Sequence, residues 1–216
     1  MTPKDTTKVI NAEINTNRIL FLGNSITRHA PLSSIGWLTD CGMAASNVEK
    51  DYVHLVASGV NKLYGKKPEI LFNNIAEFER NLKSFDLENK IKNDLDFKAT
   101  LVIVALGENV PALGSDEDKV QFKISYTKLL TLLKNNGNPT IIVRSCFWAD
   151  KTKDDIMKEA CISVGGIYID IQKLSKDESN CSRSEHKWEN AGIGAHPGDK
   201  GMQAIADAIL KALKKK

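Results

Sequence analysis

Ser25 has the position and the neighbours of a nucleophile. It follows the apolar run Arg18–Gly23, within the segment Gly23-Asn24-Ser25-Ile26-Thr27. A hydroxyl just beyond a buried strand can face a cleft, the small Gly23 permits a tight turn, and the Ser25 N–H could help to bind an oxyanion. A serine after a strand is more often a helix cap, so this motif alone does not decide its role.

Asn109 belongs to a second polar segment, Gly107-Glu108-Asn109, which follows the apolar stretch at 100–106. Its side-chain amide offers two donors and could stabilise an oxyanion if it lay close to Ser25. The alternative is that Asn109 ties down the loop before Pro111.

His196 is one of four histidines and stands directly before Pro197, near the carboxyl end of the chain. Proline restricts the backbone of the residue before it, and a general base needs a fixed geometry. Asp199 follows and suits the first turn of a helix. Taken alone, a histidine in such a loop is more often structural or exposed.

Strand and helix patterns alternate along the chain, and these elements must position the three segments. Strands are predicted at 18–23, 69–73, 100–106, 140–144 and 166–170, and helices at 48–63, 75–91 (interrupted), 115–133, 153–164 and 199–213. Such alternation indicates βαβ units. We therefore expect an α/β fold, a three-layer α/β/α sandwich with a five-stranded parallel sheet in flavodoxin-like order. Functional groups in such folds gather at the carboxyl ends of the strands.

The composition is that of an ordinary globular protein. Of its 216 residues, 42% are hydrophobic and 26% are charged, which argues against a fibrous, disulfide-rich or disordered chain. The 30 basic and 27 acidic residues leave a net charge of +3, so charge alone predicts no binding to nucleic acid. The longest apolar run, at 101–106, is far shorter than the roughly 20 residues that cross a bilayer, and we expect no membrane span.

We expect a polar lead-in at 1–17 and a single domain at 18–216. The polar start lacks the apolar core of a signal peptide. Two alternatives remain open: a cytoplasmic protein, or a secreted or periplasmic protein whose signal has been removed. The four cysteines are scattered without a C-x-x-C pair, which argues against a metal site and favours buried thiols, with one disulfide as an alternative in an exported protein. The oligomeric state stays open.

Taken together and in this order, the three segments resemble the motifs of the SGNH hydrolase superfamily, the GDSL-like lipases and acylhydrolases. The resemblance extends from about residue 18 to the end, so 18–216 is expected to be an SGNH-like hydrolase domain. Ser25 matches the nucleophile block, which reads G-N-S here instead of G-D-S. Asn109 matches the asparagine block and His196 the histidine block. Gly42, with Gly36 as a weaker alternative, matches the glycine whose N–H serves the oxyanion hole.

One position departs from the family pattern. The family usually places an aspartate three residues before the catalytic histidine, and that residue is Ile193 here. A carboxylate normally holds the imidazole in the right tautomer and stabilises the imidazolium. Three substitutes are open for His196: a backbone carbonyl near Ile193 in a Ser–His dyad, a side chain of the preceding loop (Glu185 or Glu189), or Asp170. We favour the dyad or Glu189.

Three further residues could shape the site. Glu108 and Arg144 end strands that are neighbours in the predicted order, and we expect an ion pair between them at the site floor. The alternative is two solvated charges. Trp148 follows the fourth strand and could offer an aromatic platform for a sugar ring, or pack in the core.

The resemblance implies a serine esterase or acylhydrolase. Ser25 would attack an acyl carbonyl, and His196 would carry the proton. The N–H groups of Ser25 and Gly42, with the Asn109 amide, would hold the oxyanion. The expected substrate is a small-molecule or glycan ester with a small acyl group such as acetyl, and neither a metal nor an organic cofactor is implied. The alternative is a catalytically weak or inactive carbohydrate-binding relative that lost turnover through the change at Ile193.

Overall fold

Five parallel strands form one sheet in the order β2-β1-β3-β4-β5 in the computed structural model, which describes residues 14–214. The strands are β1 (Arg18–Gly23), β2 (Glu69–Asn74), β3 (Leu101–Ala105), β4 (Thr140–Arg144) and β5 (Ile167–Ile169). All four neighbouring pairs are parallel. The predicted fold class and strand order are confirmed, whereas most of the predicted lead-in lies outside the described residues.

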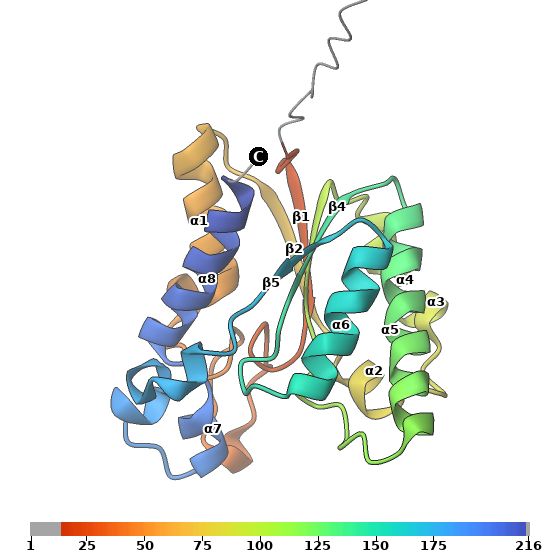
Figure 1. Cartoon of the computed structure of the whole chain (residues 1–216). Helices are drawn as coiled ribbons and strands as arrows, with labels where there is room; N and C mark the ends of the chain where they lie inside the picture. The colour runs from red at the N-terminus through yellow and green to blue at the C-terminus, as the bar shows by residue number, and fades with distance from the viewer. Residues whose placement is uncertain (1–13, 215–216) are drawn as a thin grey trace, which may run out of the picture.

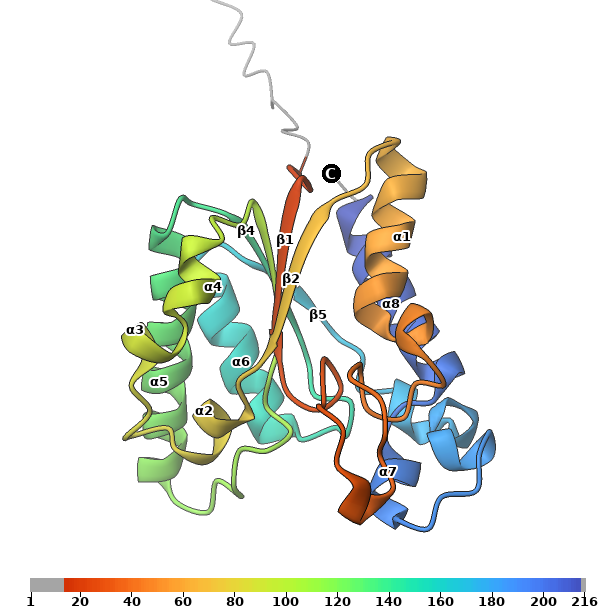
Figure 2. The same ribbon diagram turned by 180° about the vertical axis from the view of Figure 1, so that it is seen from behind.

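Helices cover both faces of this sheet (Figure 1 and, from behind, Figure 2). One face carries α1 (Tyr52–Tyr64) and α8 (Asp199–Leu213). The other face carries α5 (Asp116–Asn135) and α6 (Lys151–Ser163), with the short helices α2 (Ala76–Arg80), α3 (Leu87–Lys90) and α4 (Lys92–Asp96). The remaining short helix, α7 (Ala191–Ala195), lies beyond the end of the sheet.

The central strand β3 shows why the sheet is covered on both faces. Every residue of β3 is buried. Leu101 and Ile103 pack in the core beneath α1 and α8, whereas Val102 and Val104 pack in the core beneath α5 and α6. Side chains alternate along a strand, so an unbroken apolar run requires apolar partners on both faces.

The strand bounds agree with the prediction to within a residue, but two helical regions differ. The predicted helix at 48–63 begins as a 3₁₀ turn (Val48–Lys50), and α1 starts only after Asp51, whose carboxylate caps it. The predicted interrupted helix at 75–91 divides into α2 and α3, because the Asp86 side chain caps a new helical start by accepting from the Asn89 N–H. Between β5 and α8 the chain forms three 3₁₀ turns and α7.

The carboxyl ends of all five strands lie at one edge of the sheet. In Figure 1, β1 runs from top to bottom, so in this parallel sheet the carboxyl ends lie at the lower edge, where α7 and the loop after β1 also lie. Segments from near both ends of the sequence therefore meet at one edge.

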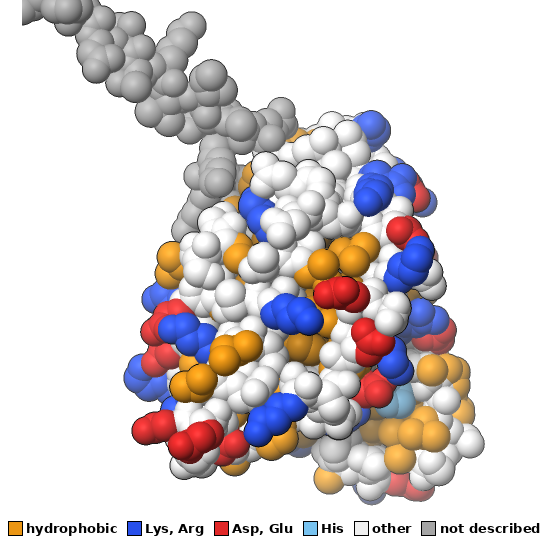
Figure 3. All heavy atoms as spheres, turned by 90° about the vertical axis from the view of Figure 1, so that its right-hand side faces the viewer, with side chains coloured by type: hydrophobic (Ala, Val, Ile, Leu, Met, Phe, Trp, Pro, Cys, Tyr) orange, Lys and Arg blue, Asp and Glu red, His pale blue; other side chains and the backbone are white. Residues whose placement is uncertain are grey.

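The surface on the α5 side mixes acidic and basic side chains (Figure 3), as in the ion pair of Lys123 with Glu159 at 2.8 Å. Among the described residues, no helix combines the length and the apolar character needed to cross a membrane.

Candidate active site

Ser25 and His196 lie side by side at the carboxyl edge of the sheet. The Ser25 Oγ is 2.8 Å from the His196 Nε2, although 171 positions separate the two residues in the sequence. Both residues are half-buried. This is the distance at which an imidazole can take a proton from a hydroxyl.

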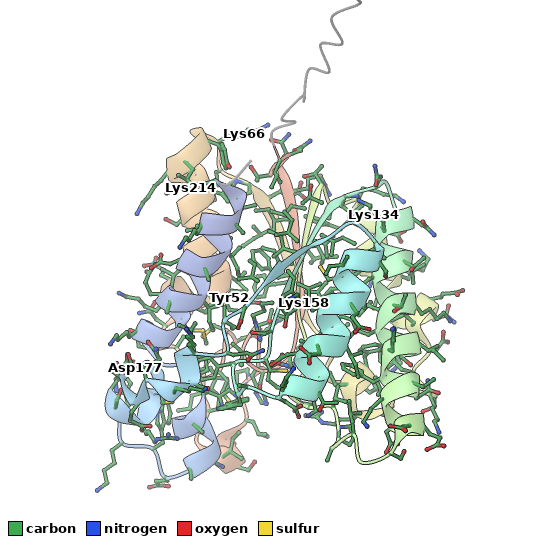
Figure 4. The ribbon with its side chains drawn as sticks, in the orientation of Figure 1. Tyr52, Lys66, Lys134, Lys158, Asp177 and Lys214 are labelled. Atoms are coloured by element: carbon green, nitrogen blue, oxygen red, sulfur yellow. The ribbon has the colours of Figure 1, made fainter. Side chains whose placement is uncertain are left out.

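The turn that carries Ser25 depends on a close approach at Gly23. A Cβ on Gly23 would lie 1.8 Å from the Thr27 Oγ1, so no other residue fits without moving that side chain. The Thr27 hydroxyl is in turn 2.7 Å from the Tyr52 hydroxyl, which reaches in from the start of α1 (Figure 4). The Thr27 N–H donates to the Asn24 carbonyl and closes the turn around Ser25.

The Nδ1 of His196 lies 2.7 Å from the carbonyl oxygen of Gly192, in α7. At the end of α7, the His196 N–H donates to the Ile193 carbonyl, three residues back. A carbonyl only accepts, so Nδ1 carries the hydrogen and Nε2 faces Ser25 as the acceptor. Of the three substitutes considered, the group at Nδ1 is therefore a backbone carbonyl close to Ile193.

The carboxylates considered for this role are placed elsewhere. Glu189 is exposed and, among the described residues, makes no hydrogen bond to His196, so the expectation that it orients the imidazole is wrong. Glu185 accepts from the N–H groups of Asp199 and Lys200 and thereby caps the start of α8. Asp170 is exposed and accepts from a neighbouring backbone N–H.

The backbone and ring of His196 are held on several sides. Its φ of −66° and ψ of 160° are the extended values that Pro197 favours, as predicted. The Trp148 ring stands edge-on to the imidazole at a centroid distance of 5.1 Å, and its Nε1 donates to the Ala195 carbonyl at 3.2 Å. Burial lowers the pKa of His196 below its ordinary value, so the free base persists to more acidic pH.

Asn109 is held at both ends of its amide. Its Nδ2 donates to the Glu79 Oε2 at 2.7 Å, and its Oδ1 accepts from the Arg80 Nη2 at 3.0 Å. Nδ2 carries two hydrogens, so one remains for another acceptor. Among the described residues, the Ser25 N–H has no acceptor.

Gly42 is engaged differently from the expectation. Its N–H faces the Asp51 Oδ2 at 3.3 Å, so in this structure it is not presented as an oxyanion donor. The next residue, Met43, donates its N–H to the Ser25 carbonyl at 2.8 Å, which ties this loop to the nucleophile turn. The weaker alternative, Gly36, ends a 3₁₀ turn in a left-handed conformation.

The predicted ion pair between Glu108 and Arg144 is present, with 2.5 Å between the Glu108 Oε1 and the Arg144 Nη1. Both side chains are buried. Burial opposes ionisation of Glu108, but the positive charge of Arg144 and the Phe147 N–H hold the pKa of this carboxyl below its usual value. The Glu108 Oε2 accepts from the Asn24 side chain at 2.7 Å, beside Ser25.

Glu79, a fully buried carboxylate in α2, was not among the residues predicted for the site. It accepts from the Asn24 side chain and from the N–H groups of Gly107 and Asn109. Burial and the nearby Glu108 raise its pKa. The sequence feature that could have indicated its burial is the position of this acidic residue next to Phe78, on the apolar side of a predicted helix.

Within residues 14–214, no group of three or more His, Cys, Asp or Glu side chains could hold a metal ion. The four cysteines, Cys41, Cys146, Cys161 and Cys181, are buried and free, which confirms the expectation of buried thiols. Burial raises the pKa of Cys161 to about 11, so this thiol stays protonated at neutral pH.

Comparison of the sequence with models of protein families and with curated proteins found no match. Solved structures share the fold. A lipase/acylhydrolase from Enterococcus faecalis has a TM-score of 0.63 at 15% identity, over 92% of this chain and 95% of that one. An acetyl xylan esterase has a TM-score of 0.57 at 17% identity, over 90% of this chain and 98% of that one.

A third structure is a carbohydrate esterase whose active site displays divergent catalytic and non-catalytic binding functions. It has a TM-score of 0.54 at 13% identity, over 93% of this chain and 65% of that one. Together these structures show that the chain shares the three-layer α/β/α fold of these hydrolases.

Proposed function

We propose that the protein is a serine esterase of the SGNH hydrolase superfamily that cleaves small acyl esters. The observation that carries the proposal is the 2.8 Å contact between the Ser25 Oγ and the His196 Nε2 at the carboxyl edge of the sheet. A Ser–His pair held in one tautomer by a third group is the arrangement that activates a weak hydroxyl nucleophile.

In the proposed reaction, the Ser25 Oγ attacks the acyl carbonyl carbon while its proton passes to the His196 Nε2. The Ser25 N–H and the second Nδ2–H of Asn109 hold the oxyanion of the tetrahedral intermediate. The intermediate collapses to an acyl-serine, and the imidazolium gives its proton to the leaving alcohol. Water then attacks the acyl-serine with His196 as base, which releases the acid and restores Ser25.

The proposed substrate is an acetyl ester on a carbohydrate. Two of the similar structures are carbohydrate-active esterases, one of them an acetyl xylan esterase. Trp148 is 37% exposed beside His196 and could stack against a sugar ring.

Hydrolysis of p-nitrophenyl acetate tests the proposed function. Ser25→Ala removes the nucleophile and is expected to lower kcat/KM by at least ~10³-fold. Ser33→Ala, in an exposed 3₁₀ turn, is the matched control and should retain full activity. Equal turnover by the wild-type chain and Ser25→Ala would reject the proposal.

A second function, carbohydrate binding with little or no turnover, is favoured by one observation. The group at the His196 Nδ1 is the neutral Gly192 carbonyl, which stabilises an imidazolium less than a carboxylate does. Calorimetric binding of acetylated xylan by a wild-type chain without Ser25-dependent turnover would support this function. Ser25-dependent turnover would exclude it.

A further inference from the structure

Helix α2 is anchored to the nucleophile turn at its start. The Ile75 N–H donates to the Gly23 carbonyl at 2.8 Å, at the end of β1. The Asn74 side chain both accepts from the Ala76 N–H and donates to the Arg28 carbonyl at 2.7 Å. This five-residue helix therefore has a fixed position relative to Ser25.

Two consecutive residues of α2 contact opposite ends of the Asn109 amide. The Glu79 Oε2 accepts from Nδ2 at 2.7 Å, and the Arg80 Nη2 donates to Oδ1 at 3.0 Å. The other Glu79 oxygen accepts from the N–H groups of Gly107 at 2.5 Å and Asn109 at 3.2 Å. One carboxylate thus holds both the backbone and the side chain of Asn109.

The chemistry of these contacts permits only one orientation of the amide. A carboxylate only accepts and a guanidinium only donates, so a flipped Asn109 would place oxygen against oxygen and N–H against N–H. With one Nδ2 hydrogen bound to Glu79, the second is held in a fixed direction. We propose that Glu79 and Arg80 are positioning residues that clamp Asn109 as the oxyanion donor, an inference that rests on the proposed esterase function.

Among the described residues, hydrogen-bond donors hold the Glu79 carboxylate, and no cation is paired with it. Glu79 is fully buried, and the fully buried Arg144 is paired with Glu108 instead. A buried charge without a cation is unfavourable, and the groups that donate hydrogen bonds to it must offset that cost. The groups that donate hydrogen bonds to Glu79 belong to Asn24, Gly107 and Asn109. These residues lie in the two segments that carry the proposed nucleophile and oxyanion donor.

A double-mutant cycle on kcat with p-nitrophenyl acetate tests the clamp. Glu79→Gln would set an amide N–H against an Asn109 donor, and we expect kcat to fall about 10²-fold with little change in KM. In an Asn109→Ala background the same substitution should cost much less, because its target is gone. Glu77→Gln is the matched control on the same helix, exposed and paired with Lys90, and should leave kcat unchanged. An equal loss from Glu79→Gln in both backgrounds would overturn the clamp.

Arg80→Met provides a second variant, because Arg80 is exposed and its loss should not prevent folding. It should lower kcat severalfold, again only when Asn109 is present. NMR of the Asn109 side-chain amide, assigned by its absence in Asn109→Ala, is independent of turnover. Its signals should shift in Glu79→Gln and Arg80→Met but not in Glu77→Gln. If the signals stay unshifted in both variants, the clamp is overturned, even in a chain without esterase activity. If the signals shift but no Ser25-dependent turnover is found, only the esterase function is rejected.

Discussion

The partner of the His196 Nδ1 decides what this imidazole can do. The Gly192 carbonyl fixes the tautomer as well as a carboxylate would, since both only accept. It lacks the negative charge that stabilises the imidazolium formed when the proton leaves Ser25. We therefore expect a working dyad whose rate depends more heavily on the oxyanion donors.

The pH dependence of kcat/KM follows from the lowered pKa of His196. Burial has the largest effect and lowers this pKa, whereas the hydrogen bond to the Gly192 carbonyl and the charge of Glu108 oppose it. The base is active when neutral, so kcat/KM for p-nitrophenyl acetate should be constant at neutral pH and fall only as pH drops through that lowered pKa. We expect the midpoint below about 6.5, the ordinary pKa of histidine. A midpoint above that value would contradict the burial of the imidazole.

At the scale of secondary structure, the fully buried Asp51 fixes the start of helix α1. Its Oδ1 accepts from the backbone N–H of His54 and lies 2.8 Å from the His54 Nδ1, and its Oδ2 faces the Gly42 N–H. One carboxylate thus caps the helix and holds the loop that runs beside Ser25. The same contact occupies the Gly42 N–H, which was predicted to be an oxyanion donor.

Asp51→Ala tests that role. The variant loses an N-cap and leaves the Gly42 N–H buried without its acceptor, so we expect the free energy of unfolding to fall by about 2–3 kcal/mol. Urea denaturation measures the change. Glu49→Ala is the control, because that side chain is exposed in the preceding 3₁₀ turn. Equal stability of the two variants would show that the Asp51 carboxylate has no special role.

The sequence predicts elements well where apolar runs have clear ends. The run at 18–23 stops at Gly23, and the helix at 199–213 has its observed bounds, because both patterns are long and sharply bounded. The placement of Ser25, Asn109 and His196 at one edge of the sheet could be predicted, because they lie a few residues after a strand or, in the case of His196, before the last helix. The contact of Gly192 with His196 could not be predicted, because every residue has a backbone carbonyl and the residue type therefore does not indicate which one accepts.

The contacts of Glu79 could not be predicted for a different reason. They depend on where a five-residue helix ends and how it packs against two loops distant in sequence, and single-sequence patterns do not fix such boundaries. The ion pair of Glu108 with Arg144 was predictable because it needed only the strand order, which places β3 beside β4.

At the scale of the whole molecule, the fold brings a loop from the first part of the chain and a segment from its last part to the carboxyl edge of the sheet. The loop after β1 supplies Ser25, and the segment before α8 supplies His196. The α1 and α8 helices, which are far apart in the sequence, pack together on the same face. The proposed chemistry depends on this contact between the Ser25 loop and the His196 segment.

Covalent labelling with an alkyl fluorophosphonate, located by peptide mass spectrometry, tests the esterase site most directly. An activated serine attacks this reagent, whereas ordinary serines do not. We expect one adduct per chain, on the peptide that contains Ser25, lost in Ser25→Ala and formed far more slowly in His196→Ala. An adduct on another residue, or ester hydrolysis that continues while Ser25 stays unmodified, would contradict the assignment of Ser25 and His196.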